Sequence, residues 1–198
     1  MRIVAGEFRG RKLHSPKNSN IRPTSDRVRE SIFNIIMPHL PNASILDLFA
    51  GTGALGLEAL SRGAAQAVFV DDNSVAIRLI KENIKLCGAQ DRVEVFQGAV
   101  DRVLSRLAKQ ERMIGRFHVV FLDPPYGKGF LERTIVSMTP LVGPAALAVA
   151  EHHRREVLPP RLGDWALTRE RKYGDTKVSF YLRETSPTSD KPEAEKHC

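Results

Sequence analysis

The sequence has few cysteines, no long apolar run and no histidine cluster, and each absence excludes a class of protein. Its two cysteines, Cys87 and Cys198, form no CxxC pair, so they predict reduced thiols rather than a disulfide framework. The longest apolar runs, such as residues 145–150, are far too short to span a bilayer, and the charged N-terminus lacks the pattern of a signal peptide. The six histidines lack metal-ligand spacing. We therefore expect a cytoplasmic protein without membrane segments or a metal site.

The charge that is present is unevenly distributed. The whole chain has a formal net charge of +7, and residues 1–30 contain eight basic and three acidic residues, a local net charge of +5. A concentrated basic segment suits a polyanion such as nucleic acid. A solvated basic face without any partner explains a charge cluster equally well, so other signals must decide between the two interpretations.

Hydrophobic periodicity from residue 43 onward predicts alternating strands and helices. We expect strands over residues 45–49, 67–70, 93–96, 117–122 and 146–150, and helices over residues 54–62, from Asn73 or Ser74 to Gly88, 100–107 and 131–138. Such repeated strand–helix units favour a parallel sheet with helices on both faces. Two more strands, near residues 165–171 and 177–183, flank a Gly174-Asp175 turn signal and are expected to pair as an antiparallel edge hairpin.

The regions outside these units have a different character. We divide the chain into a basic N-terminal extension (residues 1–40), the main α/β domain (residues 41–184) and a polar tail that we expect to be disordered (residues 185–198). In the extension, short strands at residues 2–5 and 11–14 are expected to form a hairpin, followed by a helix over residues 24–37.

A glycine-rich loop follows the first strand of the main domain, where the chain reads Asp47-Leu48-Phe49-Ala50-Gly51-Thr52-Gly53-Ala54-Leu55-Gly56. The glycines let the backbone pass close under a ligand, and Asp71 at the end of the next strand can accept hydrogen bonds from ribose hydroxyls. Taken alone, this pattern also fits a nicotinamide-dependent dehydrogenase or a tight turn without a ligand.

The charges around the loop favour S-adenosylmethionine (SAM) over a dinucleotide. Asp47 precedes the loop, and Asp71 and Asp72 are tandem acids. A pyrophosphate is anionic and favours a helix N-terminus without nearby carboxylates, whereas SAM carries a sulfonium and an ammonium and has no phosphate. The DxFxGxG pattern resembles the first motif of SAM-dependent methyltransferases. The candidate cofactor contacts here are Asp47, Phe49, Gly51, Gly53, Ala54, Asp71 and Asp72.

The tetrapeptide Asp123-Pro124-Pro125-Tyr126 follows the apolar strand 117–122. In isolation it could be only a rigid turn. In a doubly wound sheet of order 3-2-1-4-5, however, the ends of the first and fourth strands are neighbours at the point where ligands bind. Asp123 and the Pro124 carbonyl could each accept one hydrogen of an exocyclic base amine, which would aim the nitrogen lone pair at the methyl donor. Tyr126 offers a ring on which an unstacked base can lie.

Several segments resemble one family over nearly the whole chain except the tail. They are Arg2-Ile3-Val4-Ala5-Gly6 with Arg9-Gly10-Arg11-Lys12-Leu13, Arg22-Pro23-Thr24-Ser25-Asp26-Arg27-Val28-Arg29-Glu30, Leu46 to Arg62, the DPPY tetrapeptide, and Lys172-Tyr173-Gly174-Asp175-Thr176. DPPY alone is shared with DNA adenine methyltransferases, whereas the RPTxDRVRE segment is much more specific. Together the segments resemble the bacterial 16S ribosomal RNA (guanine(966)-N(2)) methyltransferases.

The resemblance implies a doubly wound, seven-stranded class I SAM-dependent methyltransferase fold of the Rossmann-like α/β class, and a guanine 2-amino target in 16S rRNA. It implies that residues 123–126 form the catalytic loop and that Gly51, Gly53 and Asp71 bind SAM. The extension would hold ribosomal RNA or an assembling small subunit through Arg9, Arg11, Lys12, Arg22, Thr24 and Arg27.

Two positions depart from the family pattern. The ribose acid, often Glu in the family, is Asp71 here and has a shorter reach. Many such enzymes have an acid after the third strand to contact adenine, but this chain has Gly98 and Ala99 there, so we expect backbone groups to make that contact.

Competing interpretations remain open at this point. They are an NAD-dependent oxidoreductase, an RNA-binding module without catalysis, and a DNA or RNA adenine-N6 methyltransferase. The intact DPPY argues against a module that only binds, and the 198 residues show no separate domain for recognising a DNA target. We expect a monomer.

Overall fold

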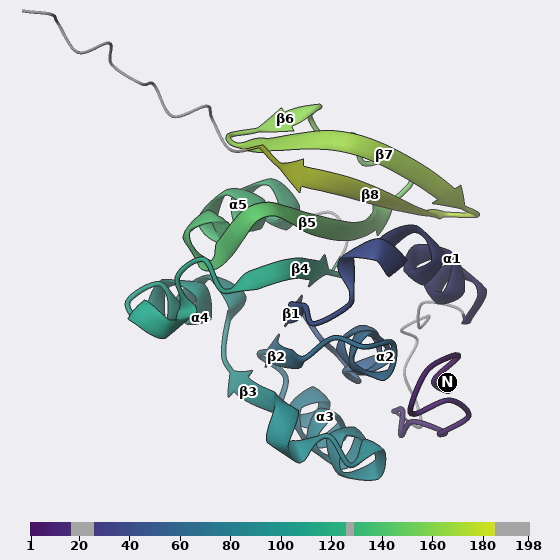
Figure 1. Cartoon of the computed structure of the whole chain (residues 1–198). Helices are drawn as coiled ribbons and strands as arrows, with labels where there is room; N and C mark the ends of the chain where they lie inside the picture. Colours follow the sequence, from purple (N-terminus) through teal and green to yellow (C-terminus); the bar gives the residue numbers. More distant parts are fainter. Residues whose placement is uncertain (17–25, 126–128, 185–198) are drawn as a thin grey trace, which may run out of the picture.

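The computed structural model describes residues 1–16, 26–125 and 129–184, and its central feature is one eight-stranded sheet (Figure 1). The strands are β1 (Ser44–Leu48), β2 (Gln66–Asp71), β3 (Val93–Gln97), β4 (Phe117–Leu122), β5 (Val142–His153), β6 (Arg161–Leu162), β7 (Trp165–Tyr173) and β8 (Thr176–Arg183). The helices are α1 (Asp26–Ile36), α2 (Ala54–Ser61), α3 (Ser74–Cys87), α4 (Val100–Leu107) and α5 (Phe130–Ser137), with short 3-10 turns η1 (Met37–His39), η2 (Gln90–Arg92), η3 (Glu111–Met113) and η4 (Thr139–Leu141).

The sheet has the strand order β3-β2-β1-β4-β5-β8-β7-β6. Strands β1 to β5 are parallel to one another, which confirms the predicted 3-2-1-4-5 order. Strands β7 and β8 form the predicted antiparallel hairpin, and β8 pairs antiparallel with β5. The two-residue strand β6 adds an eighth strand to the expected seven, because Arg161 and Leu162 pair with Ala166 and Trp165. A strand of two residues is too short to show the alternation of apolar and polar residues by which strands are predicted from sequence.

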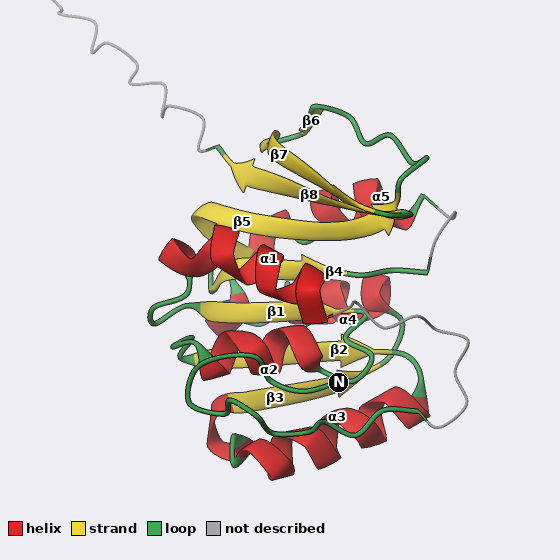
Figure 2. Cartoon of the chain, turned by 90° about the vertical axis from the view of Figure 1, so that its right-hand side faces the viewer, coloured by secondary structure: helices red, strands yellow, loops and turns green. Residues whose placement is uncertain are grey.

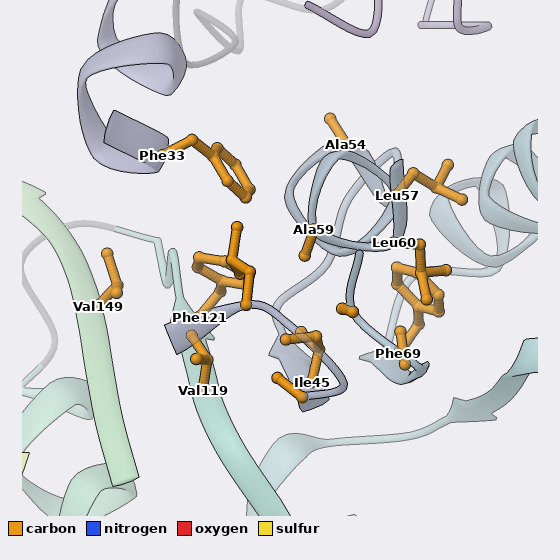
Figure 3. Close-up of a cluster of buried hydrophobic side chains, with 14 of the residues drawn as sticks. Phe33, Ile45, Ala54, Leu57, Ala59, Leu60, Phe69, Val119, Phe121 and Val149 are labelled. Atoms are coloured by element: carbon orange, nitrogen blue, oxygen red, sulfur yellow. The ribbon is translucent and has the colours of Figure 1, made fainter. Parts of the chain in front are cut away.

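Helices cover both faces of the sheet. Figure 2 shows α1, α2 and α3 in front of the strands, with α4 and α5 behind them. The face toward α1–α3 buries one apolar cluster and the face toward α4 and α5 buries a second. In the first cluster, the ring of Phe33 on α1 lies 5.7 Å from the ring of Phe121 on β4 (Figure 3). Alternate residues of each parallel strand supply the two clusters, as expected for strands buried on both faces.

The capping residues of α3 confirm the sequence prediction. The side chain of Asn73 accepts a hydrogen bond from the Val75 backbone N–H at 2.8 Å, which satisfies one of the free donors at the start of the helix. Gly88 ends the helix with φ of +65°, a left-handed conformation that glycine adopts without steric cost.

The predicted N-terminal strands are wrong in extent. Within residues 1–16, here called the N-terminal arm, the structure contains a single bridge, between Arg2 and Lys12. The backbone N–H groups of Val4 and Ala5 donate instead to the two carboxylate oxygens of Glu58 on α2, at 2.8 and 3.0 Å. Residues 1–3 do pair with residues 10–13 through backbone hydrogen bonds, such as that from the Ile3 N–H to the Arg11 carbonyl at 3.0 Å, so the predicted hairpin is present but shorter than expected.

Some predictions fall on residues that the structure does not describe. Arg22, Thr24, Tyr126 and the tail 185–198 lie outside the described residues. In the part of the chain that is described, no helix is long and apolar enough to cross a membrane.

Candidate active site

Four acidic side chains lie at the carboxyl ends of adjacent parallel strands. They are Asp47 at β1, Asp71 at β2, Asp123 after β4 and Glu151 in β5. The residue two positions before each acid belongs to the apolar cluster on the α1–α3 side. Because residues two apart in a strand project to the same face, all four acids project to that face of the sheet. The register supports this, since Asp47 pairs with both Phe69 and Phe121, the residues two positions before Asp71 and Asp123. The sheet thus gathers the acids in one row beside the glycine loop.

The glycine loop has a backbone that few other residues could adopt. Gly51 and Gly53 have φ values of +58° and +75°, and Gly53 is the N-cap of α2. A Cβ on Gly56 would lie 2.4 Å from the ring of Phe69, so glycine is required for α2 to pack against β2. Phe49 also has a positive φ, of +59°, and the centroids of its ring and the Phe130 ring are 6.2 Å apart. The loop therefore needs its glycines for both turn geometry and close packing.

Asp71 holds the loop from the end of β2. One of its carboxylate oxygens accepts a hydrogen bond from the Gly51 backbone N–H at 2.8 Å, and the other accepts one from the Asn73 N–H at 2.9 Å. Its carbonyl accepts from the N–H of Gly98, which brings the end of β3 to the same place. Each carboxylate oxygen retains lone pairs for a ligand. The neighbouring Asp72 is exposed, and Ala99 begins α4 as its N-cap.

Asp47 is buried beneath the loop. Its Oδ2 accepts a hydrogen bond from the Gly56 backbone N–H at 2.9 Å. Burial raises the pKa of Asp47 to about 8, a rise that this hydrogen bond opposes and that the charge of Asp71 reinforces. A carboxyl group in this state gains from any cation that enters the site.

Asp123 is half-buried. Burial raises the pKa of Asp123 well above its usual value, and the nearby Glu151 and Asp47 raise it further. Pro124 is buried and Pro125 is exposed, so the chain reaches the surface two residues after the acid. Here the structure brings together the glycine loop, Asp71, Gly98 and the first residues of DPPY, as predicted from the strand order.

Sequence reasoning missed two residues of this region. Glu151 is 7% exposed. It follows the apolar run of β5 just as Asp123 follows that of β4, so the sequence did contain a signal that could have identified it. Asn83 is fully buried, and its amide donates to the carbonyls of Thr52 in the glycine loop and His14 in the arm, at 2.9 and 3.1 Å. No local pattern marks a helical asparagine as such a bridge.

The basic residues of the N-terminal extension divide into two groups. Arg9, Lys12 and Arg27 are exposed, and the exposed Arg11 stacks over the Phe8 ring at 5.0 Å and donates to the Leu86 carbonyl. Arg29 is only 1% exposed and lies 3.7 Å from the buried Glu58, so this cation belongs to the core of the molecule. The exposed surface of the N-terminal extension is therefore less basic than the sequence count implies.

Comparison with known proteins identifies the family. The family model described as "Conserved hypothetical protein 95" matches residues 1–182. The ribosomal RNA small subunit methyltransferase D of Escherichia coli K12 is 40% identical over 194 residues, which cover 96% of this chain and 93% of that protein. The protein of the same name from Haemophilus influenzae is 33% identical over 186 residues, covering 91% and 93%. The chain belongs to this family. The resemblance seen in the sequence is thereby confirmed.

Solved structures agree with this assignment. A hypothetical protein of Thermus thermophilus is 32% identical, superposes with a TM-score of 0.77, and the match covers 93% of this chain and 99% of that one. A Salinibacter ruber RNA methyltransferase crystallised with S-adenosyl-L-homocysteine is 18% identical, with a TM-score of 0.61 over 85% of this chain and 97% of that one. The latter likeness establishes the fold alone, and that fold is the Rossmann-like methyltransferase fold expected from the sequence.

Proposed function

We propose that this protein is a SAM-dependent methyltransferase that modifies the exocyclic 2-amino group of a guanine in small-subunit ribosomal RNA. The proposal rests above all on the row of acids beside the glycine loop. Family membership supports the substrate class, because the relatives carry the name ribosomal RNA small subunit methyltransferase D. The guanine 2-amino target follows from the sequence resemblance.

The residues at the loop fit SAM better than a dinucleotide. Asp71 holds the start of the glycine loop and Asp47 lies beneath it, so a pyrophosphate would meet an acidic site there. A sulfonium and an ammonium would instead favour the ionised form of Asp47, whose pKa is raised by burial and by the charge of Asp71. We propose that Gly51, Gly53 and Asp71 hold the cofactor, with Phe49, Ala54, Asp72, Gly98 and Ala99 lining the same site.

Asp123 and Pro124 are positioned to orient the target amine. SAM supplies an electrophilic methyl group when bound. An exocyclic amine is a poor nucleophile because its lone pair is delocalised into the ring. Hydrogen bonds from the amine to the Asp123 carboxylate and to the Pro124 carbonyl would aim that lone pair at the methyl carbon, and the carboxylate would favour the positive charge that develops on nitrogen. The buried side chain of Pro124 fixes the backbone that presents this carbonyl.

The proposal also assigns residues that contact the RNA. Four exposed cations would bind its phosphates: Arg9, Arg11, Lys12 and Arg27. We propose that the arm and α1 form the RNA-contacting extension of a monomeric enzyme, with Arg22 and Thr24 in the same extension. Phosphate contacts of this kind position an RNA without reading its sequence.

One experiment tests the proposal directly. The purified protein is incubated with labelled SAM and with 16S rRNA or small subunits that lack the modification, and the RNA is then digested to nucleosides. We expect the label in N2-methylguanosine. Label in N6-methyladenosine would reassign the enzyme to the adenine class, and no transfer to any of these substrates would overturn the proposal. A thermal shift produced by SAM and not by NADH separates the methyltransferase from an oxidoreductase.

A further inference from the structure

The cofactor and the target base occupy different halves of the sheet edge if the proposed function is right. The cofactor residues lie at the ends of β1, β2 and β3, whereas Asp123 lies at the end of β4. A base whose amine faces Asp123 must therefore bring its RNA strand over the side of β5, β8 and β7. The arm lies on the opposite side, against α2 and α3. The residues of the β7–β8 hairpin consequently become candidates for contact with RNA.

One row of residues crosses the sheet from Asp123 to this hairpin. Leu122 pairs with Ala150, so Asp123 and Glu151 are the next pair along. Glu151 pairs with Val178, and Val178 pairs with Arg171. Side chains in such a row project to one face, and Val178 belongs to the apolar cluster on the α1 side. With strands about 4.8 Å apart, Arg171 lies about 14 Å from Asp123, on the same face.

Arg169 lies on this face as well, two residues before Arg171. It pairs with Phe180, which belongs to the same cluster as Val178. Both arginines are exposed, and neither makes an ion pair within the described part of the chain. Two other cations of the region are paired, since Lys177 lies 3.0 Å from Glu170 and Arg154 lies 3.2 Å from Asp175. Arg169 and Arg171 thus keep their positive charge available on the substrate side.

The hairpin is held firmly in place relative to the active site. Its β8 strand pairs with β5 over seven residues, from Leu147 to His153. The hydroxyl of Tyr173, at the end of β7, forms a hydrogen bond with that of Ser31 on α1. Figure 1 shows the β7–β8 turn next to α1. A charge carried by this hairpin would therefore keep a fixed distance from Asp123.

We propose that Arg169 and Arg171 form a second RNA contact, which binds backbone phosphates of the strand that carries the target nucleotide. Guanidinium groups bind phosphate oxygens in a bidentate geometry, and a site about 14 Å from Asp123 suits phosphates that flank the target. Together with the arm, this contact holds the RNA on both sides of the catalytic loop. The inference depends on the proposed function for the identity of the RNA.

The main competing role for these arginines is structural. Beyond its short pairing with β6, strand β7 is an edge strand, and charged residues on edges prevent pairing between molecules. Reversal of the charges keeps the edge charged and should preserve that role. An RNA contact, in contrast, would be lost.

The experiment compares two double variants that each change the net charge by the same amount. The first is Arg169→Glu with Arg171→Glu. The matched control, called the lysine control below, is Lys109→Glu with Arg106→Glu, two exposed residues at or just beyond the end of α4, on the face of the sheet away from the arm. Unmodified 16S rRNA transcribed in vitro is the probe, and its dissociation constant is measured by filter binding over a series of salt concentrations.

For the arginine variant we expect RNA affinity about tenfold weaker or more, and a salt dependence whose slope falls by about 2, one for each lost phosphate contact. SAM affinity and monomeric state should match those of the unsubstituted protein. Unchanged RNA affinity and salt slope would overturn the inference, as would an equal loss in the lysine control, which would reflect net charge alone. Because RNA binding is measured without methyl transfer, failure of this inference is distinguishable from failure of the proposed function.

Discussion

The side-chain amide of Asn83 donates to the carbonyl of Thr52 at 2.9 Å and so joins α3 to the glycine loop. The same side chain accepts from the N–H of His14 at 2.7 Å and donates to the His14 carbonyl at 3.1 Å. One buried amide therefore satisfies backbone groups of both the proposed cofactor loop and the N-terminal arm. The two proposed binding regions share a structural support.

Replacement of this amide should weaken both regions. Asn83→Ala would leave the Thr52 carbonyl and two His14 backbone groups without this partner. An unpaired polar group costs about 1–3 kcal/mol where it is buried, and these partly buried groups fall toward the lower end of that range. We expect a loss of about 2–4 kcal/mol in the free energy of unfolding by urea titration, weaker SAM binding, and faster proteolysis within residues 1–16. Asn34→Ala, at an exposed position on α1, is the control and should change none of these. Equal stability of the Asn83→Ala protein would show that the bridge contributes little.

Two glycines of the arm allow a matched test of its docking. A Cβ at Gly6 would lie 1.8 Å from the Ser61 carbonyl oxygen, whereas a Cβ at Gly10 would meet nothing within 4 Å. Both glycines have similar positive φ values, +82° and +84°, so alanine has a similar backbone cost at each. Gly6→Ala should detach the arm from α2 and weaken RNA binding while SAM still binds, and Gly10→Ala should have a much smaller effect. Hydrogen exchange at Val4 and Ala5 reports docking, and equal exchange in the two variants would contradict the packing argument.

The raised pKa of Asp47 predicts how stability depends on pH. Between about pH 4 and pH 8 the folded state holds a proton that the unfolded state has released, so the free energy of unfolding should fall as pH rises through this range. Asp47→Asn removes the titrating carboxyl group but keeps an acceptor for the Gly56 N–H. It should therefore make the free energy of unfolding depend less on pH. Asp72→Asn, at an exposed acid, should leave this dependence unchanged. Urea titrations at several pH values provide the measurement, and identical profiles for Asp47→Asn and the parent protein would reject the assignment.

The same group links protons to the cofactor. A bound cation favours the ionised carboxylate, so SAM affinity should increase from about pH 6 to about pH 8 and binding should release protons. Calorimetry in two buffers with different ionisation enthalpies measures that release. It should decrease in Asp47→Asn, and an unchanged release would place the titrating group elsewhere.

Substitutions at Asp123 separate charge from orientation. Asp123→Ala should nearly abolish methyl transfer while SAM affinity stays within a few-fold, because the amine needs this carboxylate most in the transition state. Asp123→Asn keeps an acceptor without the charge, and should be intermediate, with a rate about 100- to 1,000-fold below the parent. Single-turnover rates at saturating SAM and RNA provide the comparison. If the Asp123→Ala protein transfers methyl at the rate of the parent protein, the DPPY tetrapeptide has no catalytic role and is only a turn.

The parallel part of the fold could be predicted because each strand–helix unit carries its own local signals. The apolar run of β4, the cap at Asn73 and Gly88 after α3 are all readable within a few residues of the element that they define. Given the 3-2-1-4-5 order, these signals also place the glycine loop beside Asp123. The parallel sheet, and the proximity of the glycine loop to Asp123, were therefore accessible from the sequence.

The remaining features depend on contacts between residues far apart in the sequence. Arm residues Val4 and Ala5 bond to a carboxylate 54 and 53 positions away, so the predicted strands of the arm were too long. The burial of Arg29 depends on the same carboxylate, and a charge count could not separate this residue from the exposed cations. Glu151 acquires its neighbour Asp123 only through strand pairing.

The docking of the arm has a consequence for the order in which the protein can fold during synthesis. The arm is made before its partners Glu58, Ser61 and Asn83, and translation at about 5–20 residues per second makes that delay on the order of 3–15 s. During this interval Ile3 and Phe8, both buried in the finished protein, have no core to join. The segment that emerges first from the ribosome therefore cannot reach its native place until α2 and α3 have been made.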